Sequence, residues 1–294
     1  MMPRVNTVEA VHTACGVGGH ALVEARLSEI GPLRDRATPP QAPALPPRFL
    51  RHADEQTVVG VRAVLEAMAE YPTPRPSFTD YGVVAAPCRA GRFATAQSLA
   101  QARVGGGVAV SPHVVPQCSL HALAGSVSVA CGMHGPNVGS SGGDHAVAEG
   151  LFTAVSLLAG EAAASAGGMP GIWLVLSGWD REPELDEQGR PFPVASAAEP
   201  VCRALAVALT ADVDAGTGLQ FAIRMTGATA IRSTADSRAD VAADILSLAR
   251  ALAAGGAASW SHPCPWPAEL VLEPARRRAV GPRGETGLPA KEAA

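Results

Sequence analysis

The stretch from Ser111 to Leu158 constrains the fold more than any other part of the chain. It holds two helical patterns of small residues, Gln117 to Cys131 and Asp144 to Ala159, separated by a loop rich in Gly, Pro and Ser. Both patterns are apolar nearly all round, which is typical of helices that other elements cover. Such a loop drives a tight turn into the buried start of a helix, where a protein can hold a nucleophile beside an oxyanion site.

The composition favours layered packing. Hydrophobic residues make up 47% of the 294 residues but aromatic residues only 4%, so Ala, Val and Leu must form the core. Small side chains let helices lie close to a sheet, which favours an α/β arrangement over an aromatic-filled barrel. The formal charge of -4, with no Lys/Arg stripe on any periodic segment, argues against a nucleic-acid surface.

The apolar runs are short. Ile172 to Leu176 and Ala204 to Leu209 fall far below the ~20 residues that a membrane span requires, so we expect no membrane span. The first residues lack a basic stretch followed by an apolar block, so no secretory signal is expected. The six cysteines lack CxxC spacing, which favours reduced thiols in a cytoplasmic protein over a disulfide framework.

The other segments alternate between strand and helix patterns. Val5 to Ala14 predicts a first strand, closed by a turn at Gly16 to Gly19, and Ala21 to Ile30 predicts a short helix. The element order favours a mixed α/β sheet covered by helices, with the buried helices sandwiched between sheets or subunits. The remaining predicted elements are helices over Glu55 to Glu70, Phe93 to Ala102 and from Asp236 or Ser237 to Ala253, and strands over Tyr81 to Ala86, Ile172 to Ser177, Ala204 to Thr210 and Leu219 to Met225.

We expect a single domain over residues 1–273. Within it, the Pro-rich segment 37–47 is expected to be an extended surface loop. The last residues, 274–294, carry an Arg run and are rich in Gly, Pro and Glu, so a disordered tail is predicted there.

Four segments follow one another in a recognisable order: SPHVVPQCSLHALAGSVSVA (Ser111 to Ala130), the pair Gly135-Pro136, GSSGGDHAVAEGLFTA (Gly139 to Ala154) and IWLVLSGWD (Ile172 to Asp180). They resemble the N-terminal half of β-ketoacyl synthases, in the thiolase-like superfamily. In that family the corresponding segments are the piece before the active site, the Gly-Pro before the active-site strand, the nucleophile elbow with its buried helix, and the next strand with its acidic turn. The resemblance implies a layered thiolase-like half-fold, in which a mixed sheet is covered by helices and a buried helix follows the elbow.

The resemblance also locates a departure from the family. Counting from Gly135-Pro136, the position of the family's catalytic cysteine falls at Asp144. A carboxylate there, at a helix N-terminus, would be held ionised by the helix dipole and by backbone N–H groups. It would be a good helix cap and a weak acyl acceptor. His145, the next residue, is the candidate proton shuttle, and a half-exposed first-turn histidine is its structural alternative.

The family resemblance implies a particular function. Family synthases carry two catalytic His, or His and Cys, and a Lys in a C-terminal half, whereas here only His262 lies beyond the core, in SHPCPWP. We therefore expect a non-condensing, chain-length-factor-like subunit of fatty acid or polyketide biosynthesis, with no independent catalysis, or an acyltransferase if it is active. Its expected partner is a competent ketosynthase or a second copy in a homodimer, with an acyl carrier protein as a further possibility. A purely structural homodimer without a ligand stays open.

Four residues near the elbow are candidates for substrate binding: His113, His121, Gly142 and Gly143. The two histidines lie before the buried helix, and each has a structural alternative in capping carbonyls or packing at a dimer seam. No cofactor is implied, because neither glycine cluster follows the dinucleotide or P-loop spacing. No metal is implied either, because HExxH and Cys/His zinc spacings are absent from the sequence.

An alternative function follows from the same loop. Gly139 to Gly143 fits G-x-S-x-G, the nucleophile elbow of α/β-hydrolases, with Ser141 at its centre. The order Ser141, Asp180, His262 matches the hydrolase order of triad residues. This alternative is a serine-dependent acyl or ester hydrolase, or an acyltransferase, that uses Ser141. Against it, the preceding residues 133–138 contain Gly and Pro instead of a clean strand.

Overall fold

The computed structural model describes residues 13–112, 114–140, 142–164, 168–195, 198–213, 216–225, 240–255, 257 and 259–275. Over these residues the chain forms an eight-stranded sheet in the order β3-β2-β4-β5-β1-β6-β8-β7. The strands are β1 (Thr13–Arg26), β2 (Gly82–Pro87), β3 (Asn137–Gly139), β4 (Gly171–Trp179), β5 (Val201–Thr210), β6 (Leu219–Met225), β7 (Trp260–Pro263) and β8 (Ala268–Pro274). The helices are α1 (Leu27–Asp35), α2 (Glu55–Ala69), α3 (Arg92–Gly105), α4 (Val114–Gln117), α5 (His121–Cys131), α6 (Ala146–Ala164) and α7 (Val241–Ala253), with a 3-10 turn, η1 (Gly107–Ala109).

The sheet is mixed, as the element order predicts. β2 runs parallel to both β3 and β4, whereas β5 is antiparallel to its neighbours β4 and β1. β1 is shared: its first residues also pair with β6, which begins the arm β6-β8-β7. The predicted α/β class, a mixed sheet covered by helices, is confirmed.

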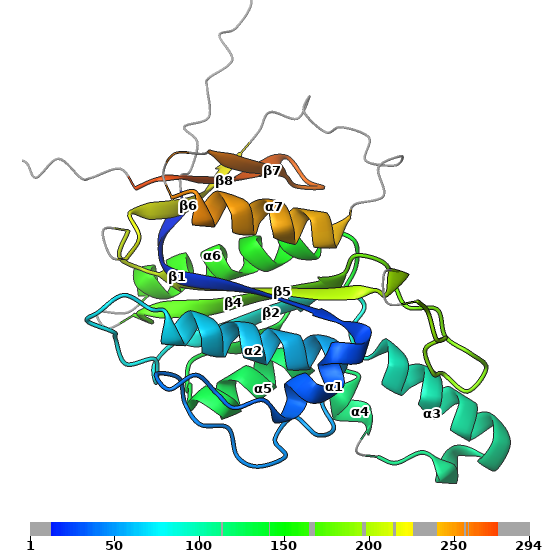
Figure 1. Cartoon of the computed structure of the whole chain (residues 1–294). Coiled ribbons are helices and arrows are strands. Elements are labelled where there is room, and N and C mark those ends of the chain that lie inside the picture. Colours follow the sequence, from blue (N-terminus) through cyan, green and yellow to red (C-terminus); the bar gives the residue numbers. More distant parts are fainter. Residues whose placement is uncertain are drawn as a thin grey trace, which may run out of the picture.

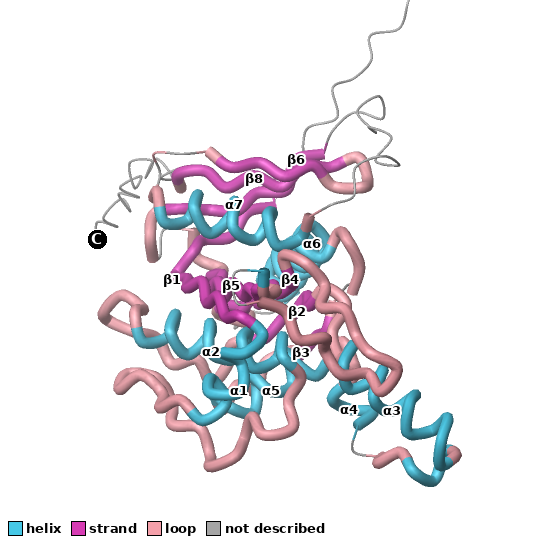
Figure 2. Tube along the Cα trace, turned by 45° about the vertical axis from the view of Figure 1, so that its right-hand side comes forward, coloured by secondary structure: helices cyan, strands magenta, loops and turns pink. Residues whose placement is uncertain are grey.

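The helices lie in two layers (Figures 1 and 2). α1, α2 and α5 cover one face of the central strands, and α6 and α7 lie between the other face and the arm. The helix α6 is largely buried, with Leu151, Ala154 and Val155 fully enclosed. The buried helix expected after the elbow is therefore present, and it is sandwiched between two parts of one curled sheet.

Strand β5 explains how a core poor in aromatics is filled. Its side chains alternate between the two faces, so alanines point towards α2 while Leu and Val point towards α6 and α7. The α2 side receives Ala204, Ala206 and Ala208, and the α6 side receives Leu205, Val207 and Leu209. Small side chains on one face let α2 pack directly on the sheet.

A glycine serves the same purpose on the other face. A Cβ at Gly150 of α6 would lie 2.7 Å from the Cβ of Ala86 and 3.0 Å from a methyl group of Leu176. Real Cβ atoms do not approach this closely, so any larger residue would push α6 away from β2 and β4. The close approach of helix to sheet that the composition predicts is thus observed.

The predicted turn at Gly16 to Gly19 is wrong, and the helix predicted over Ala21 to Ile30 is helical only from Leu27, where α1 begins. The turn and the first part of that helix lie inside the long strand β1, which pairs with β5 from Gly16 to Arg26. Ten residues of antiparallel pairing outweigh the weak strand preference of glycine. Gly18 sits at a β-bulge, and a Cβ there would overlap the ring of Tyr71. Residues 5–12 of the predicted first strand lie outside the described residues.

The C-terminal part differs from prediction in two ways. α7 begins at Val241, capped by the Asp240 carboxylate, which accepts a hydrogen bond from the backbone N of Ala243 at 3.0 Å. The predicted starts, Asp236 and Ser237, lie outside the described residues. Strands β7 and β8 were not predicted, and Pro274, expected to open the disordered tail, is the last residue of β8. Residues 276–294 of that tail lie outside the described residues.

Two further predicted elements are confirmed. The helix predicted over Glu55 to Glu70 is α2, and the strand predicted from Leu219 to Met225 is β6. Segment 37–47 forms neither helix nor strand. All six cysteines are free thiols, as their spacing indicates. Within the described ranges, no helix is both long and apolar enough to cross a membrane.

Candidate functional site

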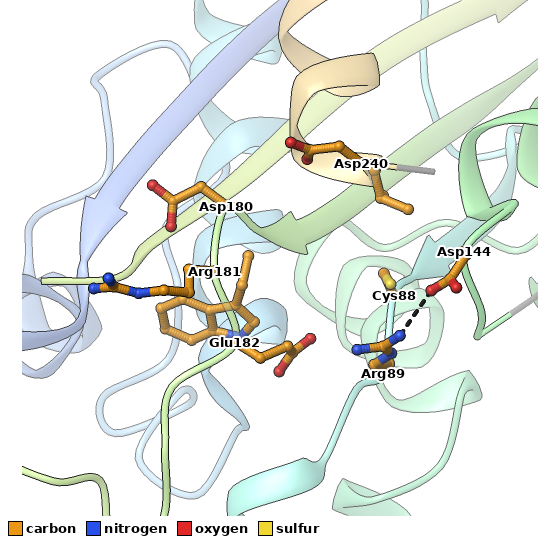
Figure 3. Close-up of a pocket in the computed structure, with 9 residues that line it drawn as sticks. Cys88, Arg89, Asp144, Asp180, Arg181, Glu182 and Asp240 are labelled. Atoms are coloured by element: carbon orange, nitrogen blue, oxygen red, sulfur yellow. Dashed lines mark hydrogen bonds and ion pairs between the residues drawn. The ribbon is translucent and has the colours of Figure 1, made fainter. Parts of the chain in front are cut away.

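A cavity of about 470 Å³, called the elbow cavity below, opens where β2 and β4 end. The two strands are parallel, so their carboxyl ends meet at one edge of the sheet, which is where α/β proteins commonly bind ligands. The starts of α6 and α7 approach the same edge (Figure 3). The lining residues are Cys88, Arg89, Asp144, Trp179, Asp180, Arg181, Glu182, Asp240 and Val241.

A buried polar network fixes the floor of this cavity. The Gln56 side-chain amide donates to the backbone oxygen of Cys88 at 2.6 Å and accepts from the Ser177 hydroxyl at 2.9 Å. The backbone N of Cys88 donates to the oxygen of Ser177 at 2.8 Å. Gln56 and Ser177 are both buried, so these bonds stay out of competition with water. The network ties α2 to the ends of β2 and β4.

Residues 142–144, which precede α6 and are called the elbow loop here, are hydrogen-bonded to the end of β2 at two points. The Arg89 guanidinium donates to Oδ1 of Asp144 at 2.8 Å, and the backbone N of Arg89 donates to the oxygen of Gly142 at 3.0 Å. Arg89 adopts φ 56, in the left-handed region that residues other than glycine seldom occupy. Such strain persists only where the surroundings enforce it, and it concentrates at functional sites.

Asp144 is held by this ion pair (Figure 3). The helix α6 begins two residues later, and its first turn is closed by backbone bonds from Ala146 to Gly143 and from Glu149 to His145. Among the described residues, the hydrogen bond of the Asp144 carboxylate goes to Arg89. A charge-assisted bond to a guanidinium is stronger than one to a neutral backbone N–H, which accounts for this choice over capping.

Cys88 is one of several cavity residues that the sequence analysis missed, with Arg89, Arg181 and Glu182. Burial raises the pKa of its thiol to about 11, with the carboxylates of Glu182 and Asp144 acting in the same direction and the Arg89 guanidinium opposing them. The thiol is therefore protonated at neutral pH and a poor nucleophile. A signal was available, because Cys88 directly follows the buried strand pattern YGVVAAP, at the end where α/β sites form.

A second cluster lies behind the elbow, between α6, α7 and β7. Nδ1 of His262 lies 3.9 Å from Oδ1 of Asp244, and the His262 ring stacks on Trp260 with centroids 5.6 Å apart. Burial lowers the pKa of His262, while Asp244 opposes that shift and His145 adds to it. Burial raises the pKa of Asp244, which His262 opposes. His145, the predicted proton shuttle, thus interacts electrostatically with both groups.

The hydrolase triad is not assembled in the part that the structure describes. Ser141 lies outside the described residues. The Asp180 carboxylate accepts from the backbone N of Val201 at 2.9 Å and lies 3.9 Å from the Arg203 guanidinium. His262 has Asp244 as its carboxylate neighbour, so Asp180 and His262 hold different partners.

The candidate substrate-binding residues are dispersed. His113 lies outside the described residues. His121 lines a separate cavity of about 390 Å³ beside α5, together with His52. Gly142 adjoins the elbow cavity through its backbone oxygen, bonded to Arg89, whereas the oxygen of Gly143 accepts from the N of Ala146.

No protein-family model matches the chain, and no curated protein matches it. Among solved structures, it is similar to a β-ketoacyl synthase from Burkholderia phymatum STM815, with a TM-score of 0.48 and 16% identity, covering 81% of this chain and 71% of the other. It is also similar to the ishigamide ketosynthase/chain length factor, with a TM-score of 0.45 and 16% identity, covering 83% and 74%. At this identity, neither protein assigns a role to any residue of this chain.

Proposed function

We propose that this protein is a cytoplasmic, ketosynthase-like subunit that does not condense acyl chains itself and pairs with a competent ketosynthase in fatty acid or polyketide biosynthesis. The observation that carries the proposal is the ion pair between Asp144 and Arg89. The family resemblance assigns Asp144 to the nucleophile position, and a carboxylate bound to a guanidinium forms no stable acyl adduct. The loop before α6 then corresponds to the family's nucleophile elbow, with a carboxylate in the position of the reacting thiol.

The chemistry of the cavity supports this proposal. Condensation needs a thiolate that accepts the acyl chain and later releases it. The thiol that lines the cavity, Cys88, is 7% exposed and protonated at neutral pH.

Intact-mass analysis with a chloroacetyl thioester tests the missing nucleophile. All proteins carry Cys118→Ser, which removes the half-buried thiol beside α4. In this background we expect no adduct at about pH 7.5, because burial raises the pKa of every remaining thiol and such thiols alkylate slowly. The variant Asp144→Cys should gain one adduct, and it should do so equally in a Cys88→Ser background. Labelling at Cys88 without Asp144→Cys would contradict the proposal, and labelling at Ser141 would favour the hydrolase alternative.

The pairing surface that we propose includes α3 and the turns that follow it. Of the fourteen residues of α3, only Phe93 is buried. Large apolar side chains around it face solvent, and contiguous exposed apolar surface marks interaction sites. These side chains are Leu99, Val104, Val108 and Val115, with Val104 92% and Val108 98% exposed. Among the described strands, the short strand β3 stands at the end of the strand order and adds a sheet edge.

Co-purification tests the pairing. The protein is expressed with the ketosynthase encoded beside it, and separately with the corresponding acyl carrier protein. We expect a complex with the ketosynthase that Val104→Asp and Val108→Asp weaken at least about tenfold, because a charge buried in an interface is costly. Phe192→Asp, at an exposed apolar residue in the loop after β4, is the matched control. A strictly monomeric protein that binds neither protein would overturn the proposal.

A further inference from the structure

The strand β1 has a long unpaired edge. It pairs with β5 from Gly16 to Arg26, but β6 pairs with it only from Thr13 to Gly16. Past Gly16, the oxygen of Val17 accepts from Thr217, and no further ladder covers this edge among the described residues. An edge strand presents backbone N–H and C=O groups to which another strand can bind.

A groove of about 590 Å³ runs along this edge. Its floor is the continuous stretch His20 to Glu24, and Figure 1 shows β1 crossing between α2 below and α7 above. Glu66 and Glu70 line it on the α2 side, and Leu246, Ala249, Arg250 and Ala253 on the α7 side. Proteins keep free edges short or shielded, so an open edge between two walls suits an added strand.

The two walls differ in chemistry. Glu66 and Glu70 are four residues apart, so like charges repel along the helix, and they lie at the C-terminal end of α2, where the helix dipole disfavours anions. No described ion pair neutralises either of them. The α7 wall is mainly apolar, with Arg250 at its last turn and Arg36 at the α1 end of the groove.

A polar atom in the groove also lacks a partner. Nδ1 of His20 is buried and makes no hydrogen bond. Burial lowers the pKa of His20, which the nearby Glu70 opposes. A buried ring nitrogen without a partner loses free energy that a ligand group could restore.

We propose that the edge of β1 binds an extended segment of another polypeptide by strand addition, with basic side chains towards Glu66 and Glu70 and apolar side chains towards α7. Successive side chains of a strand point to opposite faces, so a segment alternating basic and apolar residues satisfies both walls at once. Ala21 and Val23 pack on the α2 side and Leu22 on the α6–α7 side, which gives the floor the same alternation. This binding surface is separate from the elbow cavity and from α3.

The probe is an acetylated, fluorescein-labelled peptide of about ten residues that alternates Lys and Val. Binding is measured by anisotropy, and amide shifts locate it on the protein. We expect the Lys–Val peptide to bind at least about tenfold more tightly than the Glu–Val peptide, with shifts confined to β1 and its two walls. Methylating alternate backbone nitrogens of the peptide should abolish binding, because strand addition depends on backbone hydrogen bonds.

Protein variants complete the test. Glu66→Lys combined with Glu70→Lys should reduce Lys–Val affinity at least about tenfold, whereas Glu187→Lys, an exposed control in a distant turn, should not change it. Equal binding of the two peptides, binding that survives backbone methylation, or shifts elsewhere would each overturn the proposal. Self-association that the Glu66→Lys, Glu70→Lys variant abolishes would assign the groove to a second copy and would overturn it as well. None of these outcomes bears on Asp144.

Discussion

The helices α2 and α3 are almost equally long, yet they differ in what holds them. Twelve of the fifteen residues of α2 are buried, whereas α3 buries only Phe93 among fourteen. Isolated helices of this length are marginal in water, so most of their stability has to come from packing. For α2 that packing is the core of the protein itself. For α3 the described residues supply little packing, which is why we include α3 in the proposed pairing surface.

Truncation of one leucine in each helix should give the largest difference. Leu65→Ala in α2 removes a fully buried side chain and should lower the free energy of unfolding by about 3 kcal/mol. Leu99→Ala in α3 removes a side chain that is 66% exposed and should change it by less than about 0.5 kcal/mol. Helix propensity changes equally in both, so urea unfolding isolates burial. A cost above about 1.5 kcal/mol at Leu99 would contradict the comparison.

The helix α7 lies between these extremes. Its first turn carries Asp244, which lies next to His262 of β7, and this pair should make the free energy of unfolding depend on pH. Burial holds the pKa of His262 below its ordinary 6.5, so the unfolded chain binds a proton first as the pH falls. The stability that neutral His262 contributes is present above pH 6.5 and is lost below it, by at most about 1.4 kcal/mol per pH unit. Asp244, with its raised pKa, acts oppositely in the more acidic range.

Urea unfolding of wild type and His262→Gln between about pH 5 and pH 8 checks this expectation. The wild type should lose stability on acidification through this range relative to the variant, whose Gln does not titrate. His20, which also has a lowered pKa, is common to both proteins and cancels in the difference. Parallel profiles would show that the His262 environment does not favour the neutral ring.

The smallest expected effect concerns the accessibility of two cysteine thiols, one beside α4 and one next to α2. Cys118, beside α4, is half-buried, whereas Cys88, joined to α2 through Gln56, is buried with its pKa raised to about 11. At about pH 8 roughly one Cys88 thiol in a thousand is ionised. Iodoacetamide should therefore modify Cys118 well before Cys88, as peptide mass mapping would reveal. Faster labelling of Cys88 would mean that the elbow cavity opens.

Local sequence patterns were enough to predict the elements that are buried along most of their length. Val58, Val61 and Leu65 recur at helical spacing in α2, and β4 is an unbroken apolar run. The strand β1 depends on a distant partner, β5, whereas β7 and β8 are neighbours in sequence and pair with each other. Three glycines made the start of β1 look like a turn, and β7 and β8 contain prolines that their antiparallel pairing tolerates. No local pattern reports a partner two hundred residues away.

The candidate site divides in the same way. Counting from Gly135-Pro136 predicted Asp144 at the start of a buried helix, and the structure has Asp144 two residues before α6. Its partner could not be found that way, since Arg89 is 55 residues distant and reaches Asp144 only through a left-handed backbone. Cys88 joined the cavity because two parallel strands end together, which is a property of the sheet order.

The bulge at Gly18 changes the phase of β1 partway along its length. Before it, Cys15 and Val17 point towards α6 and α7; after it, Leu22 takes that side while Ala21 and Val23 point towards α2. Without the extra residue, the odd-numbered side chains would keep one side throughout, and the second half of the strand would meet each helix layer with the wrong set. One inserted glycine therefore exchanges which alternate side chains face each helix layer, so both halves of the strand pack correctly in the part of the sheet that each half joins.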